Sequence, residues 1–367
     1  MRYLSLFSGI EAASCAWEPM GWTPVAFAEI EPFPCSLLAH HFPGVPNLGD
    51  VRGITRAKLA ALGPIDVVIG GSPCQDLSVA GKRAGLAGDR SGLFNEQARI
   101  WHDARSVCGA RWLVWENVPG VFSSNAGRDF AAVVGALAGC EFPVPADGWG
   151  SEGVAVGPSG CVEWSVLDAQ WFGVAQRRRR VFVVVDAGDW TSRPPVLLEP
   201  ESLRGDHPPR RATAEGIAGC VVARTGGGLG TDLECDGGLI PEIVPQAMSA
   251  KWAKGTSGPA GDECANLVTV AFDARHSDVI QYGEIAGPLD TDGQTIGVQS
   301  GLEVRRLTPT ECERLQGFPD GWTAVAHRGK PAADGPRYRA LGNSMAVPVI
   351  AWIGRQIERA HTWRAEA

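Results

Sequence analysis

Short apolar runs alternate with stretches of helical spacing through the first half of the chain, and this alternation limits the folds open to it. Each run has the length of one strand, and the runs lie at residues 3–7, 25–30, 66–71, 111–118, 164–174 and 180–188. Apolar residues recur with a helical period at residues 10–22, 95–107 and 127–139. Short strands separated by helices are typical of a parallel sheet covered on both faces. We therefore predict an α/β fold with a doubly wound, mostly parallel sheet.

Composition is that of an ordinary globular protein. The chain has 367 residues, 44% apolar and 20% charged, which is enough for a large core and a second domain. No apolar run approaches membrane-spanning length, and the first residues lack the apolar core of a secretion signal. The ten cysteines form no CxxC pair, so neither a zinc module nor a disulfide framework is indicated. We expect a soluble, cytoplasmic monomer that binds no metal and no membrane.

The charge distribution leaves a nucleic-acid partner open. The formal net charge of −8 argues weakly against such a partner. Arginines are nevertheless concentrated in QRRRR (residues 176–180) and in RRLT (residues 305–308). A basic cleft on an acidic body fits both observations.

The amino-acid composition and the hydrophobic periodicity of the sequence change after Asp186. From about Trp190 to Val304 the chain is rich in Gly, Pro, Asp and Thr and shows no long helical period, so we expect either a separate, smaller region of short strands and loops or a partly disordered insert. A helix is predicted to begin after the N-cap Thr308, with Pro309 at its first position, Glu311 completing a capping box and Gly317 as its stop. Residues 342–360 are predicted to form a last helix that docks on the sheet.

A glycine turn follows the first predicted strand, in LFSGIE (residues 6–11). A strand that ends in Ser-Gly and opens a helix presents free backbone N–H groups to a ligand, although many such turns carry a glycine for steric reasons alone. Glu29 ends the next strand, and Asp50 lies at what we take as the following strand end. A glycine turn followed by acids is the order found in nucleoside-cofactor sites.

Cys74 follows the predicted strand at residues 66–71, between Pro73 and Gln75. Free cysteines are most often buried and inert. This one lies at the carboxyl end of a central strand, where α/β sheets bind ligands, so a reachable nucleophilic thiol is the alternative interpretation.

Charged residues follow two further strands. Glu116 and Asn117 end one of them, where a carboxylate is costly unless it is paired or used, although an ordinary strand-end acid is equally possible. Arginines 177–180 lead into another strand, with Arg178 and Arg180 predicted on one side and Arg177 and Arg179 on the other. Such a run is either solvated or paired with anions such as phosphates.

These blocks, closed by RRLTPTECERLQGFPDGW and YRALGNSMAVP, closely resemble the cytosine-C5 DNA methyltransferases of bacteria and phages. The resemblance covers residues 1–186 and 304–360 and implies a Rossmann-like fold that uses S-adenosylmethionine. It implies a first part of the catalytic domain at residues 1–187, a target-recognition region at 188–334 that includes the 305–322 helix block, and a returning C-terminal helix at 335–367. Residues 147–160 resemble a glycine-rich insert.

The resemblance also implies the chemistry. Cys74 would attack C6 of a cytosine flipped out of double-stranded DNA, and C5 would then take the methyl group of S-adenosylmethionine. Glu116 would bind the N3 edge of the base, and the loop at residues 76–94 would close over the DNA. The implied catalytic residues are Cys74, Glu116, Arg180, Arg178, Asn117 and Gln75. The implied DNA contacts are Ser78, Lys82, Arg83, Arg90 and Gln176.

The cofactor site implied by the resemblance joins both ends of the chain. Its residues are Phe7, Ser8, Gly9 and Ile10 at the methionine end, Glu29 at the ribose, Ile30, Asp50 and Val51 at the adenine, and Gly71, Pro73, Leu93, Asn343, Ser344 and Met345 around them. The chain departs from the family at Glu11, where a second glycine is usual, and a carboxylate there would crowd the anionic tail of the cofactor.

The sequence thus predicts a DNA (cytosine-5-)-methyltransferase, either an orphan or phage enzyme or part of a restriction-modification system. An RNA cytosine-C5 methyltransferase and an inactive DNA-binding relative are the alternatives. A nicotinamide-dependent dehydrogenase is disfavoured because GxGxxG is absent.

Overall fold

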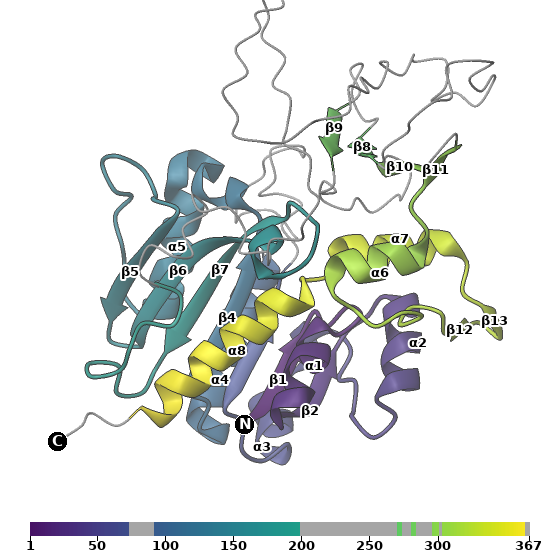
Figure 1. Ribbon diagram of the computed structural model, residues 1–367. Coiled ribbons are helices and arrows are strands. Elements are labelled where there is room, and N and C mark those ends of the chain that lie inside the picture. The colour runs from purple at the N-terminus through teal and green to yellow at the C-terminus, as the bar shows by residue number, and fades with distance from the viewer. Residues whose placement is uncertain (73–91, 199–269, 274–279, 284–295, 301–302, 364–367) are drawn as a thin grey trace, which may run out of the picture.

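The computed structural model describes residues 1–72, 92–198, 270–273, 280–283, 296–300 and 303–363 (Figure 1). Seven of the predicted site residues lie outside the described part of the chain, namely Pro73, Cys74, Gln75, Ser78, Lys82, Arg83 and Arg90. Most of the predicted target-recognition region also lies outside it.

A seven-stranded sheet with the order β2-β1-β3-β4-β7-β6-β5 forms the centre of the molecule. Its strands are β1 (Arg2–Leu6), β2 (Thr23–Ala28), β3 (Val67–Gly70), β4 (Trp112–Asn117), β5 (Glu152–Gly157), β6 (Gly160–Asp168) and β7 (Arg179–Asp186). The first four strands are parallel, whereas β7 pairs antiparallel with both β4 and β6, and β5 pairs antiparallel with β6. Only β7 and β5 therefore run against the others, and the predicted mostly parallel α/β sheet is confirmed.

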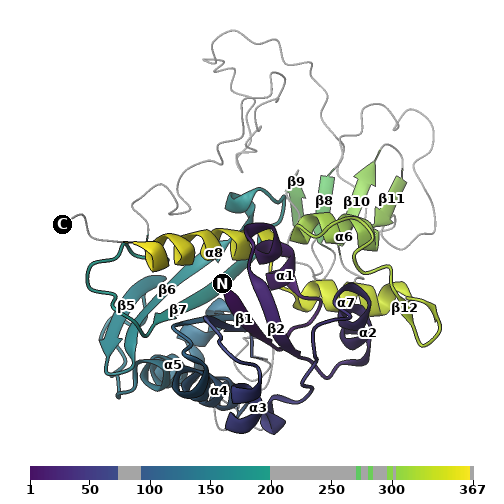
Figure 2. The same ribbon diagram turned by 90° about the horizontal axis from the view of Figure 1, so that it is seen from below.

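Helices cover both faces of this sheet (Figure 2). The α-helices are α1 (Ala12–Trp17), α2 (Pro32–His41), α3 (Arg56–Ala61), α4 (Gly92–Cys108), α5 (Arg128–Ala138), α6 (Pro309–Gln316), α7 (Asp334–Asn343) and α8 (Val347–Thr362). Short 3₁₀ helices are η1 (Glu18–Met20), η2 (Val51–Gly53), η4 (Pro119–Phe122), η5 (Ser124–Gly127) and η6 (Ala169–Phe172). Because α4 begins at Gly92, the last residues of the loop expected at 76–94 belong to a helix.

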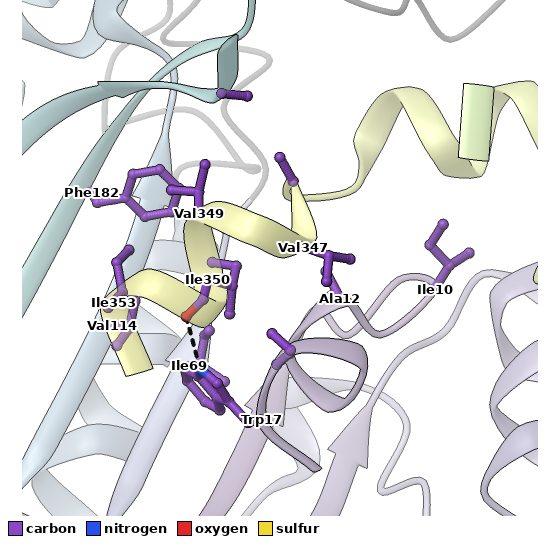
Figure 3. Packing of buried hydrophobic residues seen from close by; sticks show 14 of the residues in the cluster. Ile10, Ala12, Trp17, Ile69, Val114, Phe182, Val347, Val349, Ile350 and Ile353 are labelled. Carbon is purple, nitrogen blue, oxygen red and sulfur yellow. Dashed lines mark hydrogen bonds between the residues drawn. The ribbon is translucent and has the colours of Figure 1, made fainter. Parts of the chain in front are cut away.

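The core divides into two layers because successive strand residues point to opposite faces. Val67 and Ile69 of β3 pack with α1 and α8, whereas Val68 faces the layer that contains α4 and α5. On the first face, the indole N–H of Trp17 donates to the carbonyl of Ile350 at 2.9 Å, which joins α1 to the C-terminal helix (Figure 3). The predicted docking of the last helix on the sheet is thus confirmed.

Residues 147–160, expected to be a glycine-rich insert, include an edge strand of the sheet. Strand β5 pairs with β6 along its whole length, and the two strands are joined by the short turn at Pro158 and Ser159. Strand β6 accordingly begins at Gly160 rather than at Trp164, where the sequence placed it.

Short strands also form within the glycine-rich region that follows about Trp190 and extends to the start of α6. They are β8 (Val270–Asp273), β9 (Ile280–Gly283), β10 (Ile296–Ser300) and β11 (Glu303–Arg306), in one antiparallel sheet of order β11-β10-β8-β9. A further pair, β12 (Ala326–His327) and β13 (Lys330–Pro331), follows α6. The mostly β character predicted here is confirmed for these residues.

Helix α6 begins with the predicted capping box. The backbone N–H of Thr308 donates to the carboxylate of Glu311, and the Glu311 N–H donates to the Thr308 hydroxyl. Gly317 ends the helix with a φ of 79°. The following segment packs on the first part of the chain, since Trp322 stacks on His41 and its indole N–H donates to the carbonyl of Ile10.

Candidate functional site

A pocket lies where the carboxyl ends of β1, β3 and β4 meet the turn between α7 and α8. Its lining residues are Ser5, Leu6, Phe7, Ser8, Gly9, Glu11, Ala12, Ala13, Ile69, Gly70, Gly71, Glu116, Asn343, Ser344 and Met345. Eight of the predicted site residues are therefore brought together here: Phe7, Ser8, Gly9, Gly71, Glu116, Asn343, Ser344 and Met345. Open α/β sheets bind ligands at this edge.

The turn after β1 has an unusual backbone. Phe7, Gly9 and Glu11 all have positive φ, at 52°, 54° and 63°. The Ser8 hydroxyl fixes this turn to the neighbouring strands, because it donates to the carbonyl of Ser5 at 3.0 Å and accepts from the N–H of Ala28 at 3.1 Å. A non-glycine residue rarely adopts such φ values, so the surrounding contacts must hold the turn in place.

Glu29 faces this turn as predicted. Its Oε2 accepts the N–H of Gly9 at 2.7 Å, and its Oε1 accepts the N–H groups of Ile30 and Glu31, both at 2.8 Å. A carboxylate has about four acceptor positions, so one remains for a hydroxyl donor. The neighbouring Ile30 is 65% exposed, which leaves an apolar face uncovered beside the acid.

The sequence suggested that Asp50 ends a strand, but in the structure it does not. Asn47 makes only an isolated bridge with Phe27, and Asp50 instead begins η2 by accepting the N–H of Arg52 at 2.9 Å. The Asp50 side chain is 48% exposed and so can still accept a hydrogen bond from a ligand, whereas Val51 beside it is buried.

Glu116 and Arg180 form an ion pair within the site. The Nε of Arg180 lies 3.1 Å from Oε1 of Glu116, and both side chains are largely buried. The antiparallel pairing of β4 with β7 sets Glu116 opposite Phe182 and so brings the two side chains together. An arginine held beside a carboxylate fixes its direction.

Arg178 and Arg180 lie on the same side, as the alternation predicted, and both point inward, although their surroundings differ. Arg177 and Arg179 are exposed, and Arg178 is 3% exposed. The Nη2 of Arg178 donates to the carbonyls of Gly342 and Ser344, at 3.2 and 2.8 Å. Arg178 therefore ties the Asn343 segment to the start of β7.

Gln176 and Asn117 are also buried. Gln176 has no exposed surface, so its side chain does not reach the surface on which a DNA contact was expected. Neither of its amide atoms has a partner among the described residues. Asn117 is 1% exposed, and its Oδ1 accepts the N–H of Val118 at 2.8 Å.

Two predicted cofactor residues contact the core and do not line the pocket. Ile10 is fully buried and contributes its carbonyl to the indole N–H of Trp322, so a cofactor could meet only its backbone. Leu93 packs against the opposite layer of the core. Conversely, Ser5, Ala12 and Ala13 line the pocket but were not predicted, because no chemical signal marks them in the sequence.

Within the described ranges, no group of three or more His, Cys, Asp or Glu side chains is arranged to hold a metal ion. None of the described helices has both the length and the apolar character needed to cross a membrane.

The fold and pocket are those of a nucleoside-cofactor α/β enzyme, and the comparison with known families is more specific. Residues 1–197 and 266–359 match the model of the C-5 cytosine-specific DNA methylases. The chain belongs to this family, which implies S-adenosylmethionine as the methyl donor.

Relatives match nearly the whole chain. It is 35% identical to a protein of Escherichia phage P1 named DNA N-6-adenine-methyltransferase, over 98% of this chain and 61% of that protein. It is 26% identical to the type II methyltransferase M2.BsuMI of Bacillus subtilis, over 98% of this chain and 76% of that one. The solved Dnmt2 methyltransferase of S. pombe is similar in fold, with a TM-score of 0.55 at 16% identity over 98% of both chains.

Proposed function

We propose that this protein is a DNA (cytosine-5-)-methyltransferase that transfers a methyl group from S-adenosylmethionine to C5 of a cytosine in a specific duplex sequence. The observation that carries the proposal is Glu116, which lines the same pocket as the glycine turn and is paired with Arg180. A base bound at Glu116 would therefore lie next to a cofactor bound at Gly9.

The residues of the pocket fit S-adenosylmethionine, which supplies an electrophilic methyl group when bound. The spare acceptor position of Glu29 suits a ribose hydroxyl, and the exposed side chain of Ile30 suits the face of an adenine. Asp50, half exposed, suits the adenine amino group. The turn at Phe7, Ser8 and Gly9 and the segment Asn343–Met345 would enclose the methionine end.

The cytosine chemistry rests on the chain's own side chains. The thiolate of Cys74 would add to C6 of the base, which breaks the aromaticity and raises electron density at C5. Glu116, oriented by Arg180, would bind the N3 edge of the base; in its protonated form it would donate its proton to N3 as negative charge develops there, and take that proton back when the thiolate leaves. After methylation, loss of the C5 proton and departure of the thiolate restore the ring. The role of Cys74, and that of Gln75 beside it, rests on the family resemblance.

DNA binding is proposed on the same basis. Because C6 of a stacked cytosine is out of reach of a thiol, the base must leave the duplex. Ser78, Lys82, Arg83 and Arg90 would contact phosphates near the flipped base. We also propose that sequence choice resides between Trp190 and Val304, and that the enzyme serves as an orphan or phage methyltransferase or as part of a restriction-modification system.

The decisive experiment identifies the methylated base. Purified protein is incubated with labelled S-adenosylmethionine and unmethylated duplex DNA, and the digested nucleosides are separated by mass spectrometry. We expect 5-methylcytosine. N6-methyladenine, the product suggested by the name of the phage P1 relative, would contradict the proposal, as would methylation of RNA alone.

Cys74→Ser tests the covalent step. Since a hydroxyl is a far weaker nucleophile than a thiolate near neutral pH, turnover should fall more than about tenfold, a loss of about 1.4 kcal/mol or more in transition-state stabilisation. A covalent complex with 5-fluorocytosine DNA should form with the unmodified protein and not with this variant. Binding of S-adenosylmethionine, measured by calorimetry, should be retained as the control for folding. A variant that keeps full turnover would exclude the thiol mechanism.

A further inference from the structure

We propose that Glu11 is the counter-charge for the ammonium group of S-adenosylmethionine, so that this pocket selects a cofactor with an intact amino-acid end. The inference rests on the proposed function and deepens it. It concerns a position where the chain departs from the glycine usual in the family.

Glu11 forms part of the pocket wall rather than projecting across the pocket. It lines the same pocket as Ser8, Gly9 and Met345, yet only 1% of its surface is exposed. The sequence suggested that this carboxylate would crowd the anionic tail of the cofactor. The structure shows it folded back onto its own turn, where it caps α1 and leaves the pocket open.

The hydrogen bonds of this carboxylate leave one acceptor position unused. Its Oε1 accepts from the N–H of Ser14 at 3.1 Å and from the Ser14 hydroxyl at 3.0 Å, and its Oε2 accepts from the Ser5 hydroxyl at 2.8 Å. A carboxylate has about four acceptor positions, so one remains on Oε2. All of these donors are neutral.

No positive charge balances Glu11 in the described part of the chain. The titratable groups that act on it or are acted on by it are Tyr3 of β1, Cys15 of α1 and Glu18. None of these is a cation, and Arg180 is paired with Glu116. A buried carboxylate without a cation is costly, and burial raises the pKa of Glu11 to about 7.

A ligand cation would offset this cost. S-adenosylmethionine carries two positive groups, a sulfonium and an ammonium. Only the ammonium has N–H donors that can occupy the free position on Oε2, and such charge-assisted bonds are the stronger kind. Binding of the ammonium would lower the pKa of Glu11 and thus release protons near pH 7.

The test is calorimetric and does not depend on turnover. S-adenosylmethionine is titrated into the protein at pH 7 in two buffers of different ionisation enthalpy, alongside S-adenosylhomocysteine, which keeps the ammonium but has no sulfonium charge, and methylthioadenosine, which lacks both the amino-acid end and the sulfonium charge. The unmodified protein should release a fraction of a proton with the first two ligands and none with methylthioadenosine. Glu11→Gln should bind S-adenosylmethionine and S-adenosylhomocysteine about tenfold less tightly, without proton release, and bind methylthioadenosine unchanged.

A matched control and a second variant keep the result interpretable. Glu18 is a neighbouring exposed acid outside the pocket lining, so Glu18→Gln should leave the binding of all three ligands unaffected. If Glu11→Gln does not fold, Glu11→Gly replaces it, because glycine adopts the φ of 63° without strain.

Two results would overturn the inference while leaving the proposed function intact. One is unchanged affinity and proton release in Glu11→Gln. The other is an equal loss of affinity for all three ligands, which would reduce Glu11 to a support of the turn. Failure of the unmodified protein to bind S-adenosylmethionine would overturn the proposed function itself.

Discussion

At the scale of single residues, Gly71 sets how closely β3 approaches the ion pair. A Cβ at this position would lie 3.0 Å from Oε2 of Glu116 and 3.3 Å from the methyl carbon of Met345. Gly71 therefore lets a carboxylate from β4 and a side chain from the C-terminal segment meet at one point.

We expect Gly71→Ala to lower turnover about tenfold or more, because displacing a positioned group by a fraction of an ångström is enough to weaken catalysis. Thermal unfolding should change little, since the strain falls on the pocket lining. Gly44→Ala is the control, because a Cβ at Gly44 would meet no atom within 4 Å. Steady-state methylation assays of both variants decide the matter, and wild-type turnover in Gly71→Ala would show that this close approach is not required.

For single residues, the sequence indicates that a charged side chain needs a partner, but not always which partner it has. Glu116 could be singled out because a carboxylate after a buried strand needs a partner, and the structure supplies Arg180. That Arg178 lies on the same side as Arg180 also followed from strand alternation. Its partners could not be predicted, since they are backbone carbonyls 164 and 166 residues further along the chain. No pattern in the sequence distinguishes an arginine that binds a ligand from one that binds the backbone.

At the scale of elements, helix caps formed by residues close in the sequence could be predicted, whereas the pairing of strand β5 with β6 could not. The capping box of α6 involves only Thr308 and Glu311, so the sequence contains all of it. Strand β5 depends on β6, and its glycines allow close contact rather than marking a loop. A Cβ at Gly153 would lie 2.2 Å from the ring of Trp164, and one at Gly157 would lie 2.4 Å from the carbonyl of Ala138.

In helix α8, too, a glycine allows close contact with a neighbouring element, and this contact can be tested. A Cβ at Gly354 would lie 2.4 Å from the indole nitrogen of Trp17, which donates to Ile350 one turn earlier. Gly354→Ala should therefore lower the free energy of unfolding by about 1–3 kcal/mol, although alanine is the better helix former. In α7, a Cβ at Gly335 would meet nothing within 4 Å, so Gly335→Ala should be neutral or stabilise by up to about 1 kcal/mol. Urea unfolding of both variants measures the difference, and equal effects would mean that α1 and α8 do not pack this closely.

At the scale of the whole molecule, the site is assembled from both ends of the chain. The segment at Asn343–Met345 lines the pocket beside the turn after β1, and Trp322 contacts Ile10. Residues on either side of the glycine-rich region thus belong to one catalytic unit. Within that region, the sheet of β8–β11 leads directly into α6 (Figure 1).

We therefore expect that the preference for a DNA target sequence can be transferred together with residues 190–303. Residues 190–303 hold side chains that can read base edges in the major groove, including Arg224, Gln246, Asn266 and Gln281. The flanking segments contain every residue to which we assign chemistry. Grafting residues 190–303 onto a relative of known target sequence should give an enzyme that methylates the sequence recognised by this protein, as read by bisulfite sequencing of the modified DNA. The parent relative, expressed in parallel, provides the reference pattern. An active chimera that keeps its parent's target would instead locate sequence choice in the catalytic domain or in residues 76–91.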